Sequence, residues 1–453
     1  NGGAFLRFSG ISDIVLHRND FISNIAGSSG GAIYMFISIE DVTVTENTFL
    51  NNIANSGDAV TTNRGIDIAM GGGAVYIDVS NTRILFRQCR MHNNSAPYAS
   101  GGSCFINSNN LDITFMECNQ TFNFAYRSGG GIYMGSANTN MIVHSGVLAN
   151  NSGHLIGGGG CMMLAHNSVF FINTIIRGNH ATVGGGLLSF LNNFNIKVQG
   201  CVIQDNDATL RGGAMNIGIL HDWITIENTQ FSNNWAMVGG GISIETGNHV
   251  TIQSCQFSGN IALPSTSTVA ASARDQAAST ESFGGAVFST SDNLHIKGST
   301  FKGNAADSGG ALYVSGDNMT ILSSEFLYNA AILSGGAVEL IRCNDVLLSA
   351  CNITANSNVA VKIDSSTSIS IIKTRVVNSR GANGAAVATV SSEAVTIAES
   401  WFENNTVSGW GGALYFSGSS GVRVETSVFV HNDATKAGAI SVDLSSDVIL
   451  YNN

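Results

Sequence analysis

The chain has 453 residues and a formal net charge of −11, and only 11% of its residues are charged. An acidic chain without clusters of Lys and Arg is poorly suited to phosphates, so the composition excludes nucleic acid as a partner. No apolar run approaches the roughly 18 to 20 residues that cross a bilayer, so we predict no membrane span.

A glycine-containing motif recurs along the whole chain, first seen in full as Gly30-Gly31-Ala32-Ile33. Thirteen of the fifteen intervals between its copies fall between 23 and 29 residues, and this period is typical of a solenoid. The two longer intervals, of 42 and 45 residues, predict loop insertions at 55–70 and 263–283. The sixteen copies, aligned on the small residue after the glycines, lie at Ala4, Ala32, Ala74, Ser103, Gly131, Gly160, Gly186, Ala214, Gly241, Ala286, Ala311, Ala337, Ala360, Ala386, Ala413 and Ala439.

A second mark follows in each repeat, an apolar residue with asparagine three positions later, as in Phe49/Asn52 and Val147/Asn150. Amides stacked in one column can bond to one another and to turn backbone, so we expect an asparagine ladder. Its predicted members include Asn24, Asn52, Asn206, Asn234, Asn260, Asn304, Asn329, Asn405 and Asn432.

Short alternating segments such as 42–44 and 250–252 lie between the two marks, and such alternation indicates strands. Each repeat therefore holds three short strands. We predict an all-β chain in which residues 1–453 form one continuous parallel β-helix of about sixteen coils. The chain opens and stops inside a repeat, so we expect it to be a segment of a longer protein.

The strand after the glycines carries two apolar residues, such as Ile33 and Met35, which we expect to point inward. The residue between them points outward, and in the first coils it is apolar or aromatic. The sequence thus predicts an exposed partner-binding stripe, unless these side chains pack beneath the first insertion or a missing part of the protein. Its predicted members are Tyr34, Tyr76, Phe105, Tyr133 and Met162. The same outward column holds one acid, Glu339, and one base, Lys362.

Five of the eight cysteines lie two residues before the apolar residue of the second mark, where other repeats place Ser or Thr. We interpret them as buried free thiols on an inner ladder. Cys89 and Cys118 occupy the same column on neighbouring coils, within disulfide range, and are a candidate disulfide. The sequence has no CxxC and no His/Cys spacing typical of zinc, so we predict no metal and no cofactor.

Catalytic patterns are weak in this sequence. A β-helix that acts on acidic polysaccharide needs clustered carboxylates with nearby Arg or Lys, and the columns show no such cluster, so we predict that the protein is not an enzyme. Asn-X-Ser/Thr motifs make Asn93, Asn119, Asn318, Asn352 and Asn404 candidates for N-glycosylation in a eukaryotic secretory pathway. A sixth motif begins at Asn150, which we expect to be engaged in the asparagine ladder.

The paired marks, seen as Gly30-Gly31-Ala32-Ile33 with Phe49/Asn52, resemble the repeats of chlamydial polymorphic membrane proteins and of similar surface proteins in other bacteria and protists. The resemblance implies a right-handed, secreted β-helix used for adhesion or surface display. We therefore expect a non-catalytic extracellular or cell-surface scaffold or adhesin. Its expected partners are other proteins, copies of itself among them, and glycans are candidates too. The alternatives are a subunit of an extracellular filament and a carbohydrate-active enzyme.

Overall fold

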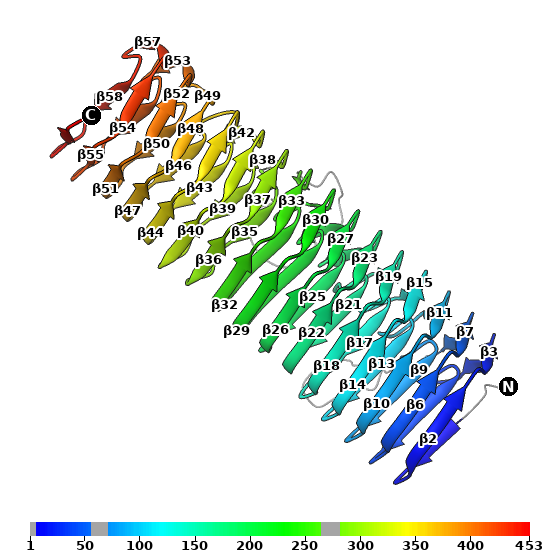
Figure 1. The fold of residues 1–453 in the computed structure, drawn as a ribbon. Coiled ribbons are helices and arrows are strands. Elements are labelled where there is room, and N and C mark those ends of the chain that lie inside the picture. Colours follow the sequence, from blue (N-terminus) through cyan, green and yellow to red (C-terminus); the bar gives the residue numbers. More distant parts are fainter. Residues whose placement is uncertain (1–5, 56–70, 264–280) are drawn as a thin grey trace. The chain divides into compact units, whose positions relative to one another are not determined.

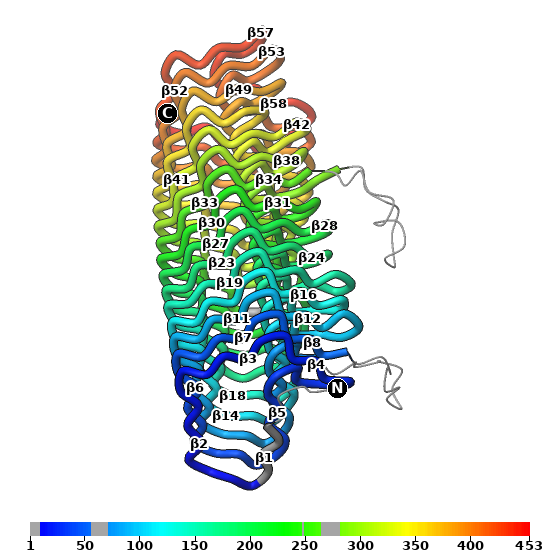
Figure 2. The backbone as a smooth tube through the Cα atoms, turned by 90° about the vertical axis from the view of Figure 1, so that its right-hand side faces the viewer, coloured from blue at the N-terminus to red at the C-terminus, as the bar shows by residue number. Residues whose placement is uncertain are grey.

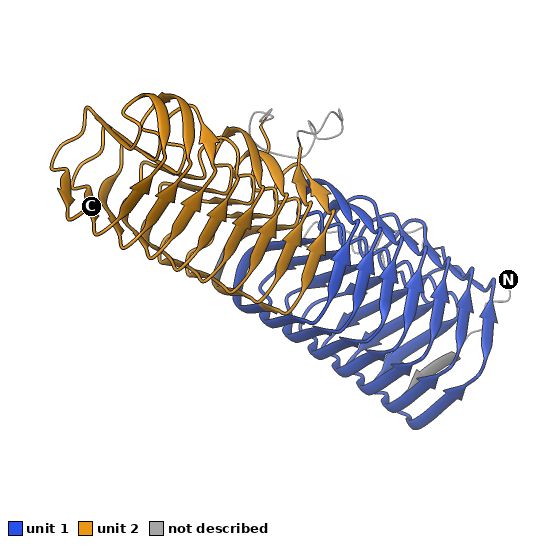
Figure 3. Cartoon of the chain, turned by 45° about the horizontal axis from the view of Figure 1, so that its top comes forward, with its two compact units in different colours: residues 1–225 blue, residues 226–453 orange. Residues whose placement is uncertain are grey.

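The computed structural model describes residues 6–55, 71–263 and 281–453. The predicted insertions at 55–70 and 263–283 fall almost wholly outside these ranges. Every regular element in the described residues is a β-strand (Figure 1). The chain divides into two compact units, Asn1–Thr225 and Ile226–Asn453 (Figure 3).

One coil of unit 1 shows the repeating pattern. Strands β5 (Ile33–Ile37) and β6 (Glu40–Thr45) lie in a first sheet, β7 (Thr48–Leu50) in a second and β8 (Ile53–Ala54) in a third. The coil therefore has four strands where the sequence predicts three. The additional one is the two-residue strand before the glycines, which is too short for alternation to reveal.

The strands of unit 1 pair in parallel with those of the next coil, with equivalent residues opposite each other (Figures 1 and 2). Its first sheet contains β1 (Leu6–Ser9), β5, β9 (Val75–Val79), β13 (Cys104–Ser108), β17 (Ile132–Met134), β21 (Cys161–Leu164) and β25 (Leu187–Leu191), followed in each coil by β2 (Ser12–His17), β6, β10 (Thr82–Arg87), β14 (Leu111–Met116), β18 (Thr139–His144), β22 (Asn167–Ile172) and β26 (Phe194–Gln199). Its second sheet contains β3 (Asp20–Ile22), β7, β11 (Arg90–His92), β15 (Asn119–Thr121), β19 (Val147–Ala149), β23 (Ile175–Arg177) and β27 (Val202–Gln204), and its third β4 (Ile25–Ala26), β8, β12 (Ser95–Ala96), β16 (Phe124–Ala125), β20 (Ser152–Gly153), β24 (His180–Val183) and β28 (Asp207–Arg211). The long strand β29 (Met215–Glu227) reaches the boundary between the units.

Unit 2 repeats the arrangement. Its first sheet contains β32 (Ile242–Gln253), β35 (Val287–Ser289), β39 (Leu312–Val314), β43 (Val338–Ile341), β46 (Val361–Asp364), β50 (Val387–Val390), β54 (Leu414–Ser417) and β58 (Ile440–Asp443), with β36 (Leu294–Lys297), β40 (Met319–Leu322), β44 (Asn344–Ser349), β47 (Thr367–Ile372), β51 (Glu393–Ala398), β55 (Arg423–Glu425) and β59 (Ile449–Tyr451). Its second sheet contains β30 (Gln230–Ser232), β33 (Gln256–Ser258), β37 (Thr300–Lys302), β41 (Glu325–Leu327), β45 (Asn352–Thr354), β48 (Arg375–Val377), β52 (Trp401–Glu403) and β56 (Val428–Val430). The third side is divided between β31 (Trp235–Ala236), β34 (Ile261–Ala262), β38 (Ala305–Ser308) and β42 (Ala330–Ser334), and a separate group of β49 (Arg380–Gly381), β53 (Thr406–Trp410) and β57 (Asp433–Lys436).

The core of each unit consists of equivalent side chains stacked from coil to coil. In unit 2, Phe231, Phe257 and Phe301 stack with ring centroids 4.7 and 4.8 Å apart and rings within 6° of parallel. This spacing equals the rung of a parallel sheet, about 4.8 Å. In these coils the sequence mark gives the true register, because the inner positions hold side chains of the same shape.

An asparagine ladder follows this stack. Asn52 donates from Nδ2 to Asn94 Oδ1 (3.0 Å) and to the Phe21 carbonyl (2.9 Å), and its backbone N–H also donates to Asn94 Oδ1 (3.0 Å). Each such asparagine satisfies turn backbone that burial would otherwise leave unpaired. The ladder contains Asn24, Asn52, Asn94, Asn123, Asn151, Asn179 and Asn206 in unit 1, and Asn234, Asn260, Asn304, Asn329 and Asn356, then Asn405 and Asn432, in unit 2.

The expectation for Asn150 is wrong. Asn150 is exposed, and its neighbour Asn151 occupies the ladder, where its Nδ2 donates to Asn179 Oδ1 (3.0 Å). The inner residue of this coil is Leu148, which pairs with Ile176, so the true spacing is Leu148/Asn151. Adjacent asparagines allow two registers in the sequence, and the strand pairing selects one.

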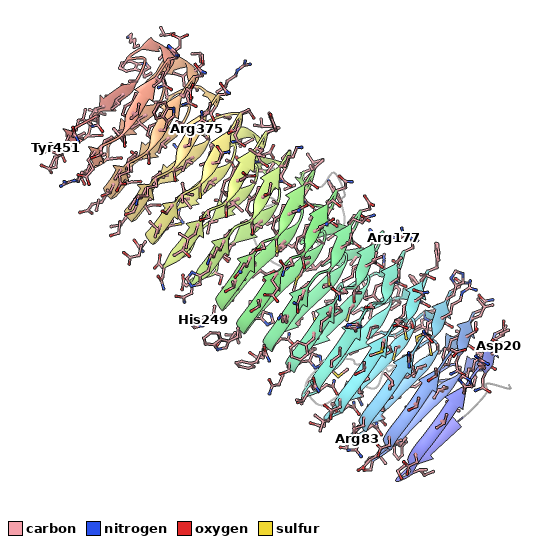
Figure 4. The ribbon with its side chains drawn as sticks, viewed as in Figure 1. Asp20, Arg83, Arg177, His249, Arg375 and Tyr451 are labelled. Atoms are coloured by element: carbon pink, nitrogen blue, oxygen red, sulfur yellow. The ribbon has the colours of Figure 1, made fainter. Side chains whose placement is uncertain are left out.

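Exposed ion pairs join successive coils on the outside. Arg83 Nε lies 2.6 Å from Asp41 Oδ1, and Arg375 Nη2 lies 2.8 Å from Glu403 Oε2; both arginines are labelled in Figure 4. The Arg83 guanidinium holds the pKa of Asp41 below its usual value. Exposed pairs of this kind contribute little to stability, so the stacked interior and its ladders determine the fold.

Candidate functional site

The predicted partner-binding stripe is buried, which corrects the expectation of an exposed surface. Tyr76, Phe105, Tyr133 and Met162 form a core cluster with Leu188, and no member is more than 7% exposed. Tyr34 is partly buried against the same cluster. The rings stack along the column, with the Phe105 centroid 5.1 Å from Tyr76 and 4.6 Å from Tyr133. Burial raises the pKa of Tyr133 to about 12.

The glycine segment before each strand covers this column. A Cβ added to Gly101 would lie 3.0 Å from Phe105 Cα, and one added to Gly158 would lie 2.7 Å from Met162 Cβ. Both glycines have positive φ, at 72° and 68°. The side chains of the column point away from the interior of the coil, as alternation predicts, but the backbone of the glycine segments covers them. Glycine is needed here because any side chain would collide with the column.

One exposed aromatic surface of unit 1 lies instead at β16 and on the loops between the third sheet and the glycine segments. We call Tyr98, Phe124, Tyr126, Leu155 and Ile156 the aromatic edge; they are between 37% and 56% exposed. These residues come from three successive coils, and backbone bonds such as Tyr126 N–H to the Ala96 carbonyl (3.1 Å) and Leu155 N–H to the Tyr126 carbonyl (3.1 Å) hold them side by side. Figure 2 shows the loops that follow β12 and β16 projecting at this side of the unit. This surface could not be predicted from the sequence, because the loops carry no repeating motif.

A groove opens over the outward column of unit 2. Its volume is about 350 Å³, and its floor contains Lys362, Ala388, Val390, Tyr415 and Ser417 from β46, β50 and β54. Residues 333–334 and 382–383, with Asn358 and Val359, also line it.

The groove exists because one coil is short. Eight positions separate the ladder residue Asn329 from Ala337 at the next strand, but only four separate Asn356 from Ala360. The short coil has no strand on the third side, where Ser357 makes only isolated bridges to Ala330 and Arg380. It therefore has no loop to cover the column.

Glu339 and Lys362, the acid and the base of the outward column in unit 2, are neighbours in the paired strands β43 and β46. Glu339 is 4% exposed; its Oε1 accepts a hydrogen bond from Ser334 Oγ (2.5 Å), and its Oε2 has no partner in the described structure. Burial raises the pKa of Glu339, which favours the neutral acid. Burial also lowers the pKa of Lys362, while Asp364 and Glu339 act in the opposite direction. Lys362 makes no hydrogen bond or ion pair with any residue that the structure describes.

The candidate disulfide is also wrong: Cys89 and Cys118, like the other six cysteines, are free thiols and buried. Cys89 Sγ donates to the Val44 carbonyl (3.2 Å) and Cys118 Sγ to the Phe86 carbonyl (3.4 Å). Residues in register on parallel strands have parallel Cα–Cβ vectors, so their Cβ atoms stay about one rung, 4.8 Å, apart. A disulfide needs Cβ atoms about 3.5–4.5 Å apart.

The candidate glycosylation sites differ in exposure. Asn93, Asn119, Asn318 and Asn404 are exposed, whereas Asn352 is half-buried. Asn93 Nδ2 donates to Asn51 Oδ1 (2.8 Å), and Asn318 Nδ2 to Asn293 Oδ1 (2.6 Å), so both amides take part in contacts between coils. Their modification stays a prediction.

The residues that the structure describes contain no helix capable of crossing a bilayer. Within the same residues, no three His, Cys, Asp or Glu side chains gather into a group that could hold a metal ion.

Parallel pairing of each coil with the next defines the class of protein, a right-handed parallel β-solenoid. The family model described as "Right handed beta helix region" matches residues 73–257 and 284–453, which is more than half of the chain. This protein therefore belongs to the right-handed β-helix family.

Several solved structures resemble this chain weakly. They include PfbA, a surface adhesin of Streptococcus pneumoniae (9% identity over 89% of this chain and 84% of that one, TM-score 0.29). They also include the receptor-binding domain of the Siphovirus 9NA tailspike (9%, 96% and 72%, 0.27) and the A-module of the mannuronan C-5 epimerase AlgE6 of Azotobacter vinelandii (13%, 93% and 91%, 0.26). Comparison with curated proteins gives no match. Similarities this weak do not indicate the function of this protein.

Proposed function

We propose that this protein is a non-catalytic scaffold or adhesin, at the cell surface or outside the cell, that binds another protein through its aromatic edge. The observation that carries the proposal is the exposure of Tyr98, Phe124, Tyr126, Leu155 and Ile156 on three successive coils. Contiguous exposed apolar groups of this kind are typical of interaction surfaces.

The aromatic edge has two further properties that suit protein binding. Tyrosine and other aromatic side chains are enriched at the centres of protein interfaces, where they are often the residues that contribute most to affinity. The loop backbone is fixed by hydrogen bonds to the preceding coil, such as Arg127 N–H to the Ala99 carbonyl (3.0 Å). A loop ordered before binding loses less conformational entropy on association.

Site-specific photocrosslinking in the source organism tests this proposal. A photoreactive phenylalanine derivative would replace Tyr126, and the matched control would carry it at Tyr328, an aromatic residue of unit 2 that is 59% exposed. We expect one discrete protein adduct with the Tyr126 probe and none with the control.

The partner's identity separates the alternatives. An adduct with a second copy of this chain would favour the filament subunit, and an adduct with a different surface protein would favour the adhesin. Absence of any protein adduct at Tyr126, or equal adducts at both positions, would contradict binding through the aromatic edge.

A further inference from the structure

The groove of unit 2 is rich in hydrogen-bond donors. Lys362 Nζ, Asn383 Nδ2 and Ser417 Oγ have no partners among the described residues. The acceptor of the Asn383 amide is already used, because its Oδ1 accepts the backbone N–H of Trp410 (2.8 Å). A ligand that complements Lys362 and Asn383 is therefore one that accepts hydrogen bonds.

The charges around the groove also favour a ligand that accepts hydrogen bonds. Lys362 is half-buried, and its buried neighbour Glu339 makes no ion pair with it; Glu339 Oε1 accepts a hydrogen bond from Ser334 Oγ (2.5 Å) instead. The carboxylate of Asp364, on the same strand, accepts a hydrogen bond from Ser365 Oγ (2.8 Å) and makes no ion pair with Lys362. The ammonium group is thus left without a direct counter-ion among the described residues, and a bound carboxylate would supply one.

The other residues that line the groove suit a compact ligand that carries the carboxylate. Ala388, Val390 and Leu333 are apolar, and Tyr415 presents its ring while its hydroxyl donates to Asp443 Oδ2 (3.4 Å). A volume of about 350 Å³ is at the small end of the range for small-molecule sites, about 300–1,000 Å³.

We propose that this groove binds a small organic carboxylate, with the carboxylate on Lys362 and Asn383 and the body of the ligand over Ala388 against Tyr415. The site is separate from the aromatic edge and does not depend on the protein contact proposed there. Nothing in its geometry requires a reaction; it is a binding site.

The test is a titration of the whole chain followed by ligand-detected NMR. The probes are benzoate, which has a flat apolar body, and glucuronate, which has a hydroxylated one. Their uncharged counterparts are benzamide and glucose, and inorganic phosphate serves as an anion of different shape. We expect at least one carboxylate to bind, at least tenfold tighter than its uncharged counterpart and than phosphate. The carboxylate that binds tighter shows whether the groove prefers a flat apolar ligand or a hydroxylated one.

Variants locate the site. K362M should weaken carboxylate binding at least tenfold, whereas K302M, which changes an exposed lysine of the same unit, should leave it unchanged. A388Y should also abolish binding by filling the floor, and Tyr415 shows that the column accepts tyrosine. Thermal unfolding of each variant checks that it is folded, and K362M decides the outcome if A388Y is not. Equal binding by K362M and the unaltered chain, no binding of either carboxylate, or phosphate binding as tight as the carboxylates would overturn the proposal.

Discussion

Replacing His166 with asparagine should protect unit 1 against acid. His166 is 2% exposed on an inner ladder; its backbone N–H donates to Asn193 Oδ1 (2.8 Å), its Nε2 lies 3.1 Å from the Met134 carbonyl, and its Nδ1 has no partner in the described structure. Burial lowers the pKa of His166 to about 4, an effect that the contact with Met134 only partly offsets. The equivalent positions on the preceding and following coils are Asn138 and Asn193, so asparagine suits this site.

The sign and size follow from the pKa difference between the folded and unfolded states. Because the folded pKa of His166 is lower than the unfolded value of 6.5, the unfolded chain binds the proton more readily between these pH values. The stabilisation is fully present above pH 6.5 and is lost as the pH falls towards 4. At 1.36 kcal/mol per unit, the total loss is about 3 kcal/mol, of which about 2.5 is reached at pH 4.5.

Urea unfolding, followed by circular dichroism at pH 7.5 and pH 4.5, measures the effect. H166N should gain about 2.5 kcal/mol over the unaltered chain on moving from pH 7.5 to pH 4.5. The matched control is H431N, which changes an exposed histidine and should show no such gain. An equal pH response of H166N and the unaltered chain would refute the reasoning, because His166 would then not be buried as a neutral ring.

Three other experiments test the interior of unit 1. F105A removes a ring from the middle of the buried column and should reduce the free energy of unfolding by about 3–5 kcal/mol, while Y98A on the aromatic edge should change it by less than about 0.5; similar losses for both would contradict the assignment of Phe105 to the core. Gln120 is 1% exposed and neither atom of its side-chain amide has a partner in the described structure, so Q120L should stabilise the chain by about 1–3 kcal/mol, and a destabilised variant would show that the amide is satisfied. Cys89 and Cys118 should react with maleimide only after unfolding, as followed by mass spectrometry, and labelling of the folded chain would place these thiols at the surface.

The sequence determines the register of the coils well, because register depends on side chains that contact their own equivalents. The stacking of Phe231 on Phe257 follows from the apolar mark alone. The mark fails where the inner residue is polar. Gln120 occupies the position of Met91 and Leu148, so the ladder residue Asn123 carries no apolar mark.

The orientation of the outward column was also predictable, but its burial was not. Alternation gives the direction of a side chain such as Phe105, whereas its burial depends on whether another segment packs over it. The cover that the glycine segments form over the column is a tertiary contact, which the repeating pattern does not reveal. The short interval of 23 residues from Ala337 to Ala360 marks, in the sequence, the coil that opens the groove around Lys362. The interval can be interpreted only once the glycine segments of the other coils are known to cover the column.

Hydroxyl-radical footprinting of the intact chain, with oxidation of each tyrosine measured by mass spectrometry, tests the central claim most directly. The glycine segments bury the aromatic column and leave the aromatic edge in water. Tyr98 and Tyr126, at 56% and 41% exposed, should be oxidised rapidly, and Tyr76 and Tyr133, at 0% and 7%, should be protected until the chain unfolds. Oxidation of Tyr76 and Tyr133 as fast as that of Tyr98 would contradict the account.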